Sequence, residues 1–354
     1  MRVNDRRPPR GGRAAIALLF ASPLWLIAPA ARGALSTEVA SNPAPAGSFG
    51  AGFATCPVGT QALSGGTDVD NVLSMWIAAS APVFGPTYLI DQPDGSAPAP
   101  TTWYGAAQNH ASGTLNVKFA AICSSEISPT TMVASWSVAA AGSNGGIVHC
   151  PLGTVAIGGG VDVENILHML VTGSGLVFAG DVGLLLTPDG TQPAPIGWSG
   201  YVRNDDSVPH AMKVAAICSS AVAATAVVGS ASVNSGSFGS VNVPCPVGAD
   251  LIGGGIEPGN VFSVNVTSSA PLFAGPTPFL AQQPDGTASA PIGWSAYAVN
   301  GDFSVQPVKV AAICPEPDGG LAGASLLGAA MLLSSARRRA RRGGPAISLR
   351  RHSL

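Results

Sequence analysis

The sequence predicts an all-β fold of three tandem β-sandwich-like domains, and three observations support this prediction. Glycine and proline are abundant, with 45 and 30 residues among 354, whereas only 10% of the residues are charged. Short segments rich in Val, Ile, Thr and Ser alternate with turn signals, as is typical of β-strands. A pair of cysteines also recurs three times at matching places. Between the two ends, no stretch of sequence carries the sustained apolar stripe and caps of a helix.

The repeat has a period of about 95 residues, set by Cys56, Cys150 and Cys245. This period is too long for the common solenoid units and fits tandem independent domains. Within each copy, an Asn, a Phe, a Pro-Asp-Gly, a Trp and a closing Ala-Ala-Ile-Cys keep their order, and the length varies only between the Phe and the Pro-Asp-Gly. We expect this variable segment to be a loop that carries any ligand contact. The predicted segments are a signal peptide (1–30), three repeat domains (35–125, 126–220 and 221–315) and a C-terminal tail (315–342).

A period-two pattern predicts a half-buried strand in each copy. The expected inward positions are Leu73, Met75 and Ile77, then Leu167, Met169 and Val171, then Phe262, Val264 and Val266. The repeated tryptophans Trp103, Trp198 and Trp294 alternate with Gly or Ala and are predicted to lie in the core. The Gly158–Gly160 run opens no helix, so we interpret it as a bulge or a close backbone approach rather than a nucleotide loop.

Six cysteines, two in each copy, predict structural disulfides in an exported chain. The simplest pairing joins the two cysteines of each copy: Cys56–Cys123, Cys150–Cys218 and Cys245–Cys314. Zinc is the rival interpretation, but the cysteines lack the Cys-x-x-Cys or paired His pattern of zinc sites.

Both ends of the chain have the composition of targeting segments. Five arginines precede an apolar run at 14–28 and a small-residue stretch, which is the layout of a secretory signal peptide. A retained membrane anchor is the alternative. The C-terminus contains Pro315-Glu316-Pro317, a short apolar run that begins at Leu321, and a basic cluster. The cluster includes Arg337, Arg338 and Arg339.

This C-terminal order resembles the PEP-CTERM sorting tail. The resemblance covers about the last forty residues and implies processing by an exosortase-type membrane protease in a bacterium that makes exopolysaccharide. It also implies transient membrane anchoring through a short hydrophobic helix. The apolar run is shorter than the roughly 20 residues that a bilayer normally requires. Gly319-Gly320 also fits the related GlyGly-CTERM tail, processed by a rhomboid-like protease, and an ordinary C-terminal anchor is a further alternative.

Acidic and basic residues are distributed unevenly along the chain. Residues 35–316 hold four basic and seventeen acidic residues, a net charge of −13, while the other thirteen basic residues lie in the two ends. Nucleic acid is therefore a poor candidate partner, because phosphate binding requires a Lys/Arg surface.

Acidic residues follow the glycine-containing strand in each copy. Asp68, Asp70, Asp162 and Glu164 are calcium candidates, although a turn in which Asp and Asn bind nearby backbone explains the pattern equally well.

The outward positions of the strands after the tryptophans offer candidate ligand contacts. Tyr201, Arg203 and Tyr297 are candidates for a sugar-stacking surface, although exposed tyrosines on strands are also ordinary. Lys118, Lys213 and Lys309 share one offset, and we expect each to pair with a carboxylate near the acidic turn.

The sequence predicts no enzyme, because it contains no recognisable set of catalytic residues and no cofactor motif. The predicted function is that of an exported cell-surface or extracellular-matrix protein with a structural or adhesive role, which the tail's resemblance links to exopolysaccharide. The alternatives are an array of carbohydrate-binding modules and, third, a secreted hydrolase.

Overall fold

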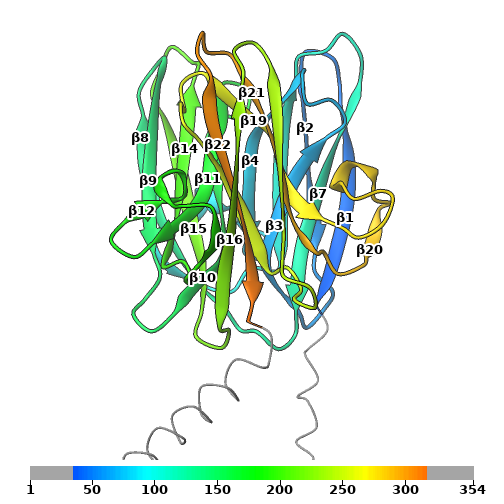
Figure 1. Cartoon of the computed structure of the whole chain (residues 1–354). Helices are drawn as coiled ribbons and strands as arrows, with labels where there is room; N and C mark the ends of the chain where they lie inside the picture. Colours follow the sequence, from blue (N-terminus) through cyan, green and yellow to red (C-terminus); the bar gives the residue numbers. More distant parts are fainter. Residues whose placement is uncertain (1–34, 317–354) are drawn as a thin grey trace, which may run out of the picture. The chain divides into compact units, whose positions relative to one another are not determined.

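A computed structural model describes residues 35–316, which form 22 β-strands and three short 3₁₀ helices (Figure 1). The all-β, sandwich-like prediction is confirmed. The signal peptide and nearly all of the C-terminal tail lie outside the described residues. Within residues 35–316, no helix is long and apolar enough to cross a membrane.

Each repeat contributes one set of strands. The first comprises β1 (Ser36–Ala44), β2 (Phe49–Thr55), β3 (Gln61–Val69), β4 (Met75–Val83), η1 (Leu89–Asp91), β5 (Gly95–Ala97), β6 (Thr102–Asn109) and β7 (Leu115–Ser124). The second comprises β8 (Thr130–Val138), β9 (Gly142–His149), β10 (Val155–Val163), β11 (Met169–Phe178), β12 (Val182–Gly183), η2 (Leu184–Leu186), β13 (Gly190–Gln192), β14 (Gly197–Asn204) and β15 (His210–Ser219). The third comprises β16 (Ala224–Val233), β17 (Phe238–Pro244), β18 (Gly253–Pro258), β19 (Val264–Leu272), η3 (Leu280–Gln282), β20 (Gly286–Ala288), β21 (Gly293–Asn300) and β22 (Gln306–Pro315).

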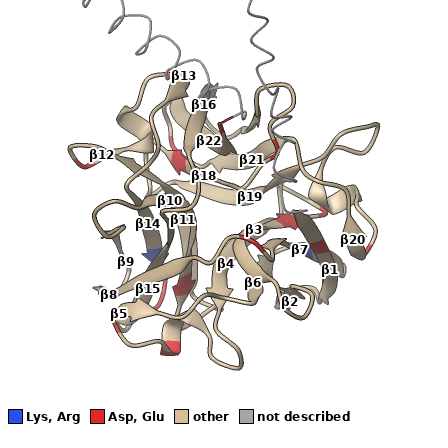
Figure 2. Ribbon diagram, turned by 90° about the horizontal axis from the view of Figure 1, so that it is seen from below, with Lys and Arg blue, Asp and Glu red and all other residues tan. Residues whose placement is uncertain are grey.

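Each repeat folds as two three-stranded halves that pack against each other, β1-β7-β3 and β2-β6-β4 in the first repeat. Each half then forms one continuous sheet with a half of a neighbouring repeat. Strand β4 pairs with β10, β11 pairs with β18, and β19 returns to pair with β3 (Figure 2). The expectation of three independent sandwiches is therefore corrected: every sheet combines strands of two repeats, and the three repeats close into a ring.

The short strands complete this exchange between repeats. Strand β5 pairs with β8, β13 pairs with β16, and β20 pairs with β1, so each repeat adds a strand beside the first strand of the next. The order β17-β21-β19-β3-β7-β1-β20 of one sheet thus contains strands of the third repeat at both edges. Because the third repeat pairs back with the first, residues far apart in sequence hold the ring closed.

The glycine run makes the close approach between sheets possible, as the sequence predicts. A Cβ on Gly159 would lie 2.4 Å from the Trp198 ring and 2.4 Å from the Ala215 carbonyl oxygen. A Cβ on Gly160 would lie 2.4 Å from the Ser80 carbonyl oxygen of the first repeat. Gly159 therefore leaves room for the tryptophan, and Gly160 leaves room for the neighbouring repeat. The first and third repeats show the same contacts.

The three tryptophans lie in the core, as predicted, each only 1% exposed. Each indole N–H donates to a serine hydroxyl, and the pairs are Trp103–Ser80 (3.0 Å), Trp198–Ser174 (2.9 Å) and Trp294–Ser269 (3.0 Å). These serines lie on β4, β11 and β19, the strands that pair with a strand of the next repeat. The hydrogen bonds satisfy the buried indole donors and fix each ring beside a junction between repeats.

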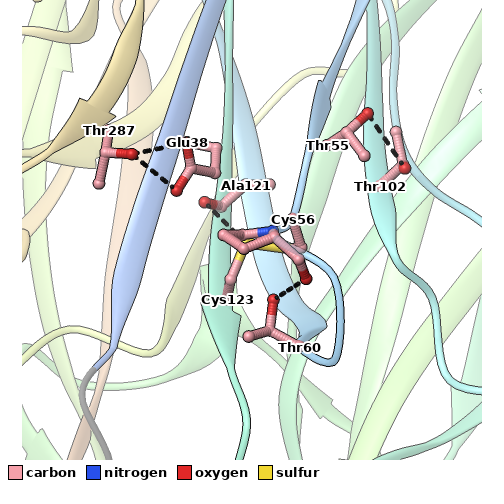
Figure 3. Close-up of a disulfide and its surroundings, with 9 residues drawn as sticks. Glu38, Thr55, Cys56, Thr60, Thr102, Ala121, Cys123 and Thr287 are labelled. Atoms are coloured by element: carbon pink, nitrogen blue, oxygen red, sulfur yellow. Dashed lines mark hydrogen bonds between the residues drawn. A yellow bond between two sulfur atoms is a disulfide. The ribbon is translucent and has the colours of Figure 1, made fainter.

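All three predicted disulfides are present: Cys56–Cys123, Cys150–Cys218 and Cys245–Cys314. Figure 3 shows the first of them. Antiparallel pairing brings all three to the same end of the molecule, here called the disulfide end. Ser36 lies opposite Cys123, and Pro315 follows Cys314 directly, so both ends of the described chain lie there too.

One part of the predicted strand pattern is wrong. Met75, Met169 and Val264 are fully buried, but Leu73, Leu167 and Phe262 are 60%, 53% and 63% exposed. In each copy a repeated asparagine accepts a hydrogen bond from the N–H of this residue, and the pairs are Asn71–Leu73, Asn165–Leu167 and Asn260–Phe262. This turn directs the side chain outward before the strand begins.

Candidate functional site

The acidic residues and the repeated lysines form clamps between the repeats. Asp162 on β10 accepts a hydrogen bond from the backbone N–H of Ile90 (3.0 Å), the middle residue of η1 in the first repeat. Lys213, its neighbour across the strands, donates to the carbonyl oxygen of Gln92 and lies 3.5 Å from Asp94. The second repeat therefore holds η1 at two points, with a carboxylate on the N–H of Ile90 and an ammonium on the carbonyl of Gln92, which directly follows η1.

The same clamp occurs at the other two junctions. Glu257 and Lys309 hold η2 through Leu185 N–H (3.1 Å), the Thr187 carbonyl and Asp189 (3.2 Å). Asp68 and Lys118 hold η3 through Ala281 N–H (2.8 Å), the Gln283 carbonyl and Asp285 (3.0 Å). The lysines thus pair with the Asp of Pro-Asp-Gly in the preceding repeat. A fixed carboxylate partner was expected, but its predicted place near the acidic turn is wrong.

Burial controls the ionisation of the three clamp acids. It raises the pKa of Asp162 to about 6, and it also raises the pKa of Asp68 and of Glu257. Hydrogen bonds from backbone N–H groups to each carboxylate partly offset this effect.

The four calcium candidates do not come together around one point. Asp68 and Asp162 hold the segments just described, Asp70 accepts hydrogen bonds from the backbone and side chain of Asn116, and Glu164 accepts one from Ala211 N–H (2.7 Å). Within residues 35–316, no group of three or more His, Cys, Asp or Glu side chains has the arrangement of a metal site. The interpretation as a structural turn accounts for these contacts.

The three candidate ligand residues lie beside these junctions. Tyr201 is half-buried next to Glu257, and its pKa is raised by burial and by that carboxylate. Tyr297 packs edge-on against Phe279, which precedes η3, with ring centroids 5.7 Å apart. Arg203 makes two hydrogen bonds to Asp205 and one to the carbonyl oxygen of Phe262 (3.0 Å) in the third repeat. The side chains of all three residues are thus engaged in contacts with neighbouring elements.

The variable segments have a structural role that the sequence does not reveal. Leu89, Leu184 and Leu280 of the three 3₁₀ helices are fully buried against neighbouring strands. Each segment that was expected to be a ligand-binding loop is therefore inserted into the junction with the next repeat.

A partly exposed aromatic cluster occurs in the first repeat, in which Tyr104 is buried. Phe53, Tyr88 and Tyr104 form three ring pairs with centroids 5.1–5.6 Å apart. Phe53 is 42% exposed and Tyr88 is 36% exposed. The cluster is specific to this repeat, because Ser199 and Ser295 occupy the place of Tyr104 in the other two. Sequence reasoning missed it because the three residues come from β2, the variable segment and β6.

A second group of exposed aromatic residues lies at the end of the molecule opposite the disulfides, here called the distal end. Phe238, Phe262 and Phe303 of the third repeat are 49%, 63% and 100% exposed, and they come from three different loops or loop ends. We call them the distal phenylalanines. Their loops are joined by backbone hydrogen bonds, Gly236 to Asn300 (2.9 Å) and Gly301 to Ser263 (2.8 Å). Exposed apolar patches mark interaction sites, so these three side chains are candidate contacts of such a site.

The polar contacts of His210 in the second repeat have a counterpart in the third repeat. His210 lies 2.8 Å from Asp206 and 3.6 Å from Glu164, next to an open hollow that includes Trp136. In the third repeat, Gln306 donates to Asp302 (2.7 Å) at the same place. A neutral amide thus forms the same loop-tethering contact, which indicates a structural role for His210.

Comparison of the chain with models of protein families and with curated proteins found no match.

Proposed function

We propose that this chain is an exported bacterial protein of the cell surface or extracellular matrix with a non-enzymatic, adhesive role. Three disulfides support an oxidising location, because such bonds persist mainly in exported proteins. In this proposal the C-terminal tail attaches the chain transiently to the membrane before an exosortase-like or rhomboid-like protease processes it.

The observation that carries the proposal is that the chain ends and the distal phenylalanines lie at opposite ends of the molecule. Both ends of the described chain lie at the disulfide end (Figure 1), whereas the distal phenylalanines lie at the other end. A chain that is attached by its tail would therefore present these side chains away from the attachment point. The interlocked sheets between the two ends supply a rigid spacer.

The test is a binding experiment with the full oxidised chain. Cell-free matrix from the producing bacterium is sedimented with the parent protein, with Phe262→Ser/Phe303→Ser, and with Leu186→Ser as the matched control. Leu186 is 79% exposed and lies in η2, away from the distal loops. We expect a loss of at least tenfold in bound protein for the double variant and none for the control. Equal binding of all three proteins would contradict an adhesive role of the distal phenylalanines.

Carbohydrate binding is the second candidate function, and the aromatic cluster of the first repeat favours it. Aromatic rings with exposed faces are suited to stacking on sugars, and Phe53 and Tyr88 both have exposed surface. A glycan array probed with the parent protein and with Tyr88→Ala tests this candidate. Binding that Tyr88→Ala abolishes would support it, and uniform silence of the parent protein would count against it.

A further inference from the structure

Three apolar side chains project from matching turns at the disulfide end. Val58, Leu152 and Val247 each follow a Cys-Pro pair and precede a glycine. They are 106%, 104% and 105% exposed, so none has a packing partner in the fold. We call them the tip residues.

The conformation of these turns does not require apolar residues at the tips. In the first repeat, the N–H of Thr60 donates to the carbonyl oxygen of Pro57 (3.0 Å), and the Thr60 hydroxyl donates to the same oxygen (2.7 Å, Figure 3). Gly59 adopts a φ of 86°, which suits glycine at the third position of a type II turn. The second position, occupied by Val58, accepts most residue types, so the turn itself does not explain a fully exposed valine.

Repetition distinguishes the tips from isolated surface leucines and valines, which are ordinary. The three turns are closed by equivalent hydrogen bonds, and their glycines have φ values of 86°, 83° and 84°. Each turn belongs to a different repeat of the closed ring. Three such points define a plane at the end of the molecule, which suits contact with an extended surface better than contact with a small ligand.

The path of the chain indicates which surface this is. The backbone N–H of Glu316 donates to the carbonyl oxygen of Ala223 (2.9 Å), which fixes the last described residue at the disulfide end. Only four residues separate Glu316 from Leu321, where the apolar run before the arginine cluster begins. Those residues span at most about 17 Å when extended. If the run enters a bilayer, the disulfide end is held close to the lipid headgroups.

From these observations we infer that Val58, Leu152 and Val247 insert into the headgroup region of a lipid bilayer and seat the molecule on it by its disulfide end. The inference rests on the proposed attachment through the C-terminal tail. Short apolar side chains at an interface are stabilised by burial of apolar surface. Three contacts, unlike a single tether, also fix the orientation, so that the distal phenylalanines point away from the membrane.

The charge at this end selects the type of lipid. Asp250 and Glu316 lie beside the third turn and at the chain exit, and none of the four Lys and Arg residues of 35–316 lies in the three turns. Anionic headgroups would therefore repel this end. The geometry fits a zwitterionic lipid such as phosphatidylcholine or phosphatidylethanolamine.

The experiment uses the full oxidised chain reconstituted into phosphatidylcholine vesicles. A genetically encoded solvatochromic amino acid replaces Val247 and, in a matched control, Leu167, which is 53% exposed at the distal end. We expect a blue shift and quenching by headgroup spin-labelled lipid at position 247 and neither change at position 167. The shift at position 247 should be lost when Val58 and Leu152 are both replaced by Ser.

The outcomes separate this inference from the proposed attachment. If the protein binds vesicles but shows no blue shift at position 247, the insertion of the tip residues is overturned, whereas attachment by the tail is not. Protein that does not bind vesicles would overturn both. A shift that persists in the Val58→Ser/Leu152→Ser background would contradict a joint contact by three tips. Exposed tip residues contribute little to folding, and an unchanged melting temperature of the variants verifies this.

Discussion

The Lys213 ammonium lies 3.5 Å from the Asp94 carboxylate, and the two residues belong to different repeats. The lysine side chain is only 13% exposed, and it also donates to the Gln92 carbonyl oxygen. We expect Lys213→Met to lower the free energy of unfolding by about 1–2 kcal/mol, because it leaves that carbonyl without a charged donor.

The control for this variant is Asp94→Asn. Asp94 is 51% exposed, so the ion pair itself is screened by water and contributes less than about 1 kcal/mol. Chemical denaturation of the two variants compares the contribution of the whole Lys213 side chain to the free energy of unfolding with that of its ion pair to Asp94. Identical stability of Lys213→Met and the parent protein would contradict the clamp.

Gly159→Ala tests the close approach of Trp198. The new Cβ would lie 2.4 Å from both the indole ring and the Ala215 carbonyl oxygen, so the ring or the strand must move. We expect a loss of about 3 kcal/mol or more in the free energy of unfolding. Gly175→Ala is the matched control, because its nearest neighbour, the Ile256 carbonyl oxygen, is 3.4 Å away and no positive φ is involved. Thermal melts should separate the two variants, and equal effects would contradict the role of Gly159.

The raised pKa of Asp162 predicts a specific dependence of stability on pH. Burial raises this pKa from 3.8 to about 6, so between these values the folded state holds a proton that the unfolded state has released. The free energy of unfolding should therefore fall as pH rises through that window, by on the order of 3 kcal/mol for this group. Asp162→Asn cannot ionise and should lack this contribution.

The free energy of unfolding of the parent protein and of Asp162→Asn is measured by chemical denaturation at pH 4 and at pH 7. The difference between the two proteins is then compared at the two pH values. Asp285 supplies the control, because its pKa is lowered, and hydrogen bonds from Ser41 and Lys118 favour its ionised form. Its stabilising effect is lost only as pH falls below 3.8, so the Asp285→Asn difference should stay nearly constant between pH 4 and pH 7 and should shrink only below that range. A pH-independent difference for Asp162→Asn would contradict a buried acid at this place.

Much of the local structure follows from the sequence because it depends on residue type and offset. Paired cysteines, a glycine beside a buried tryptophan and a closing apolar strand are each restricted by covalent geometry or by space. Cys150–Cys218, the burial of Trp198 and a close approach at the Gly158–Gly160 run were therefore predictable, whereas the identity of the side chain beside Gly159 was not.

The sharing of strands between repeats was not predictable in the same way. The junction of β4 and β10 involves one bridged pair, Ser80 and Val161, and neither residue type specifies a partner in another repeat. For the same reason, the sequence indicates that Lys213 has a fixed partner but does not identify Asp94. The Phe53–Tyr88–Tyr104 cluster also depends on pairing across strands and could not be found from offsets alone.

Scanning calorimetry of the oxidised chain shows whether the three repeats unfold as one closed structural unit. Because every sheet contains strands of two repeats, unfolding one repeat removes partners from the others. We expect a single transition with equal calorimetric and van't Hoff enthalpies, and a shift of that whole transition in Gly159→Ala. Separate transitions, with Gly159→Ala moving only the one assigned to the second repeat, would contradict it.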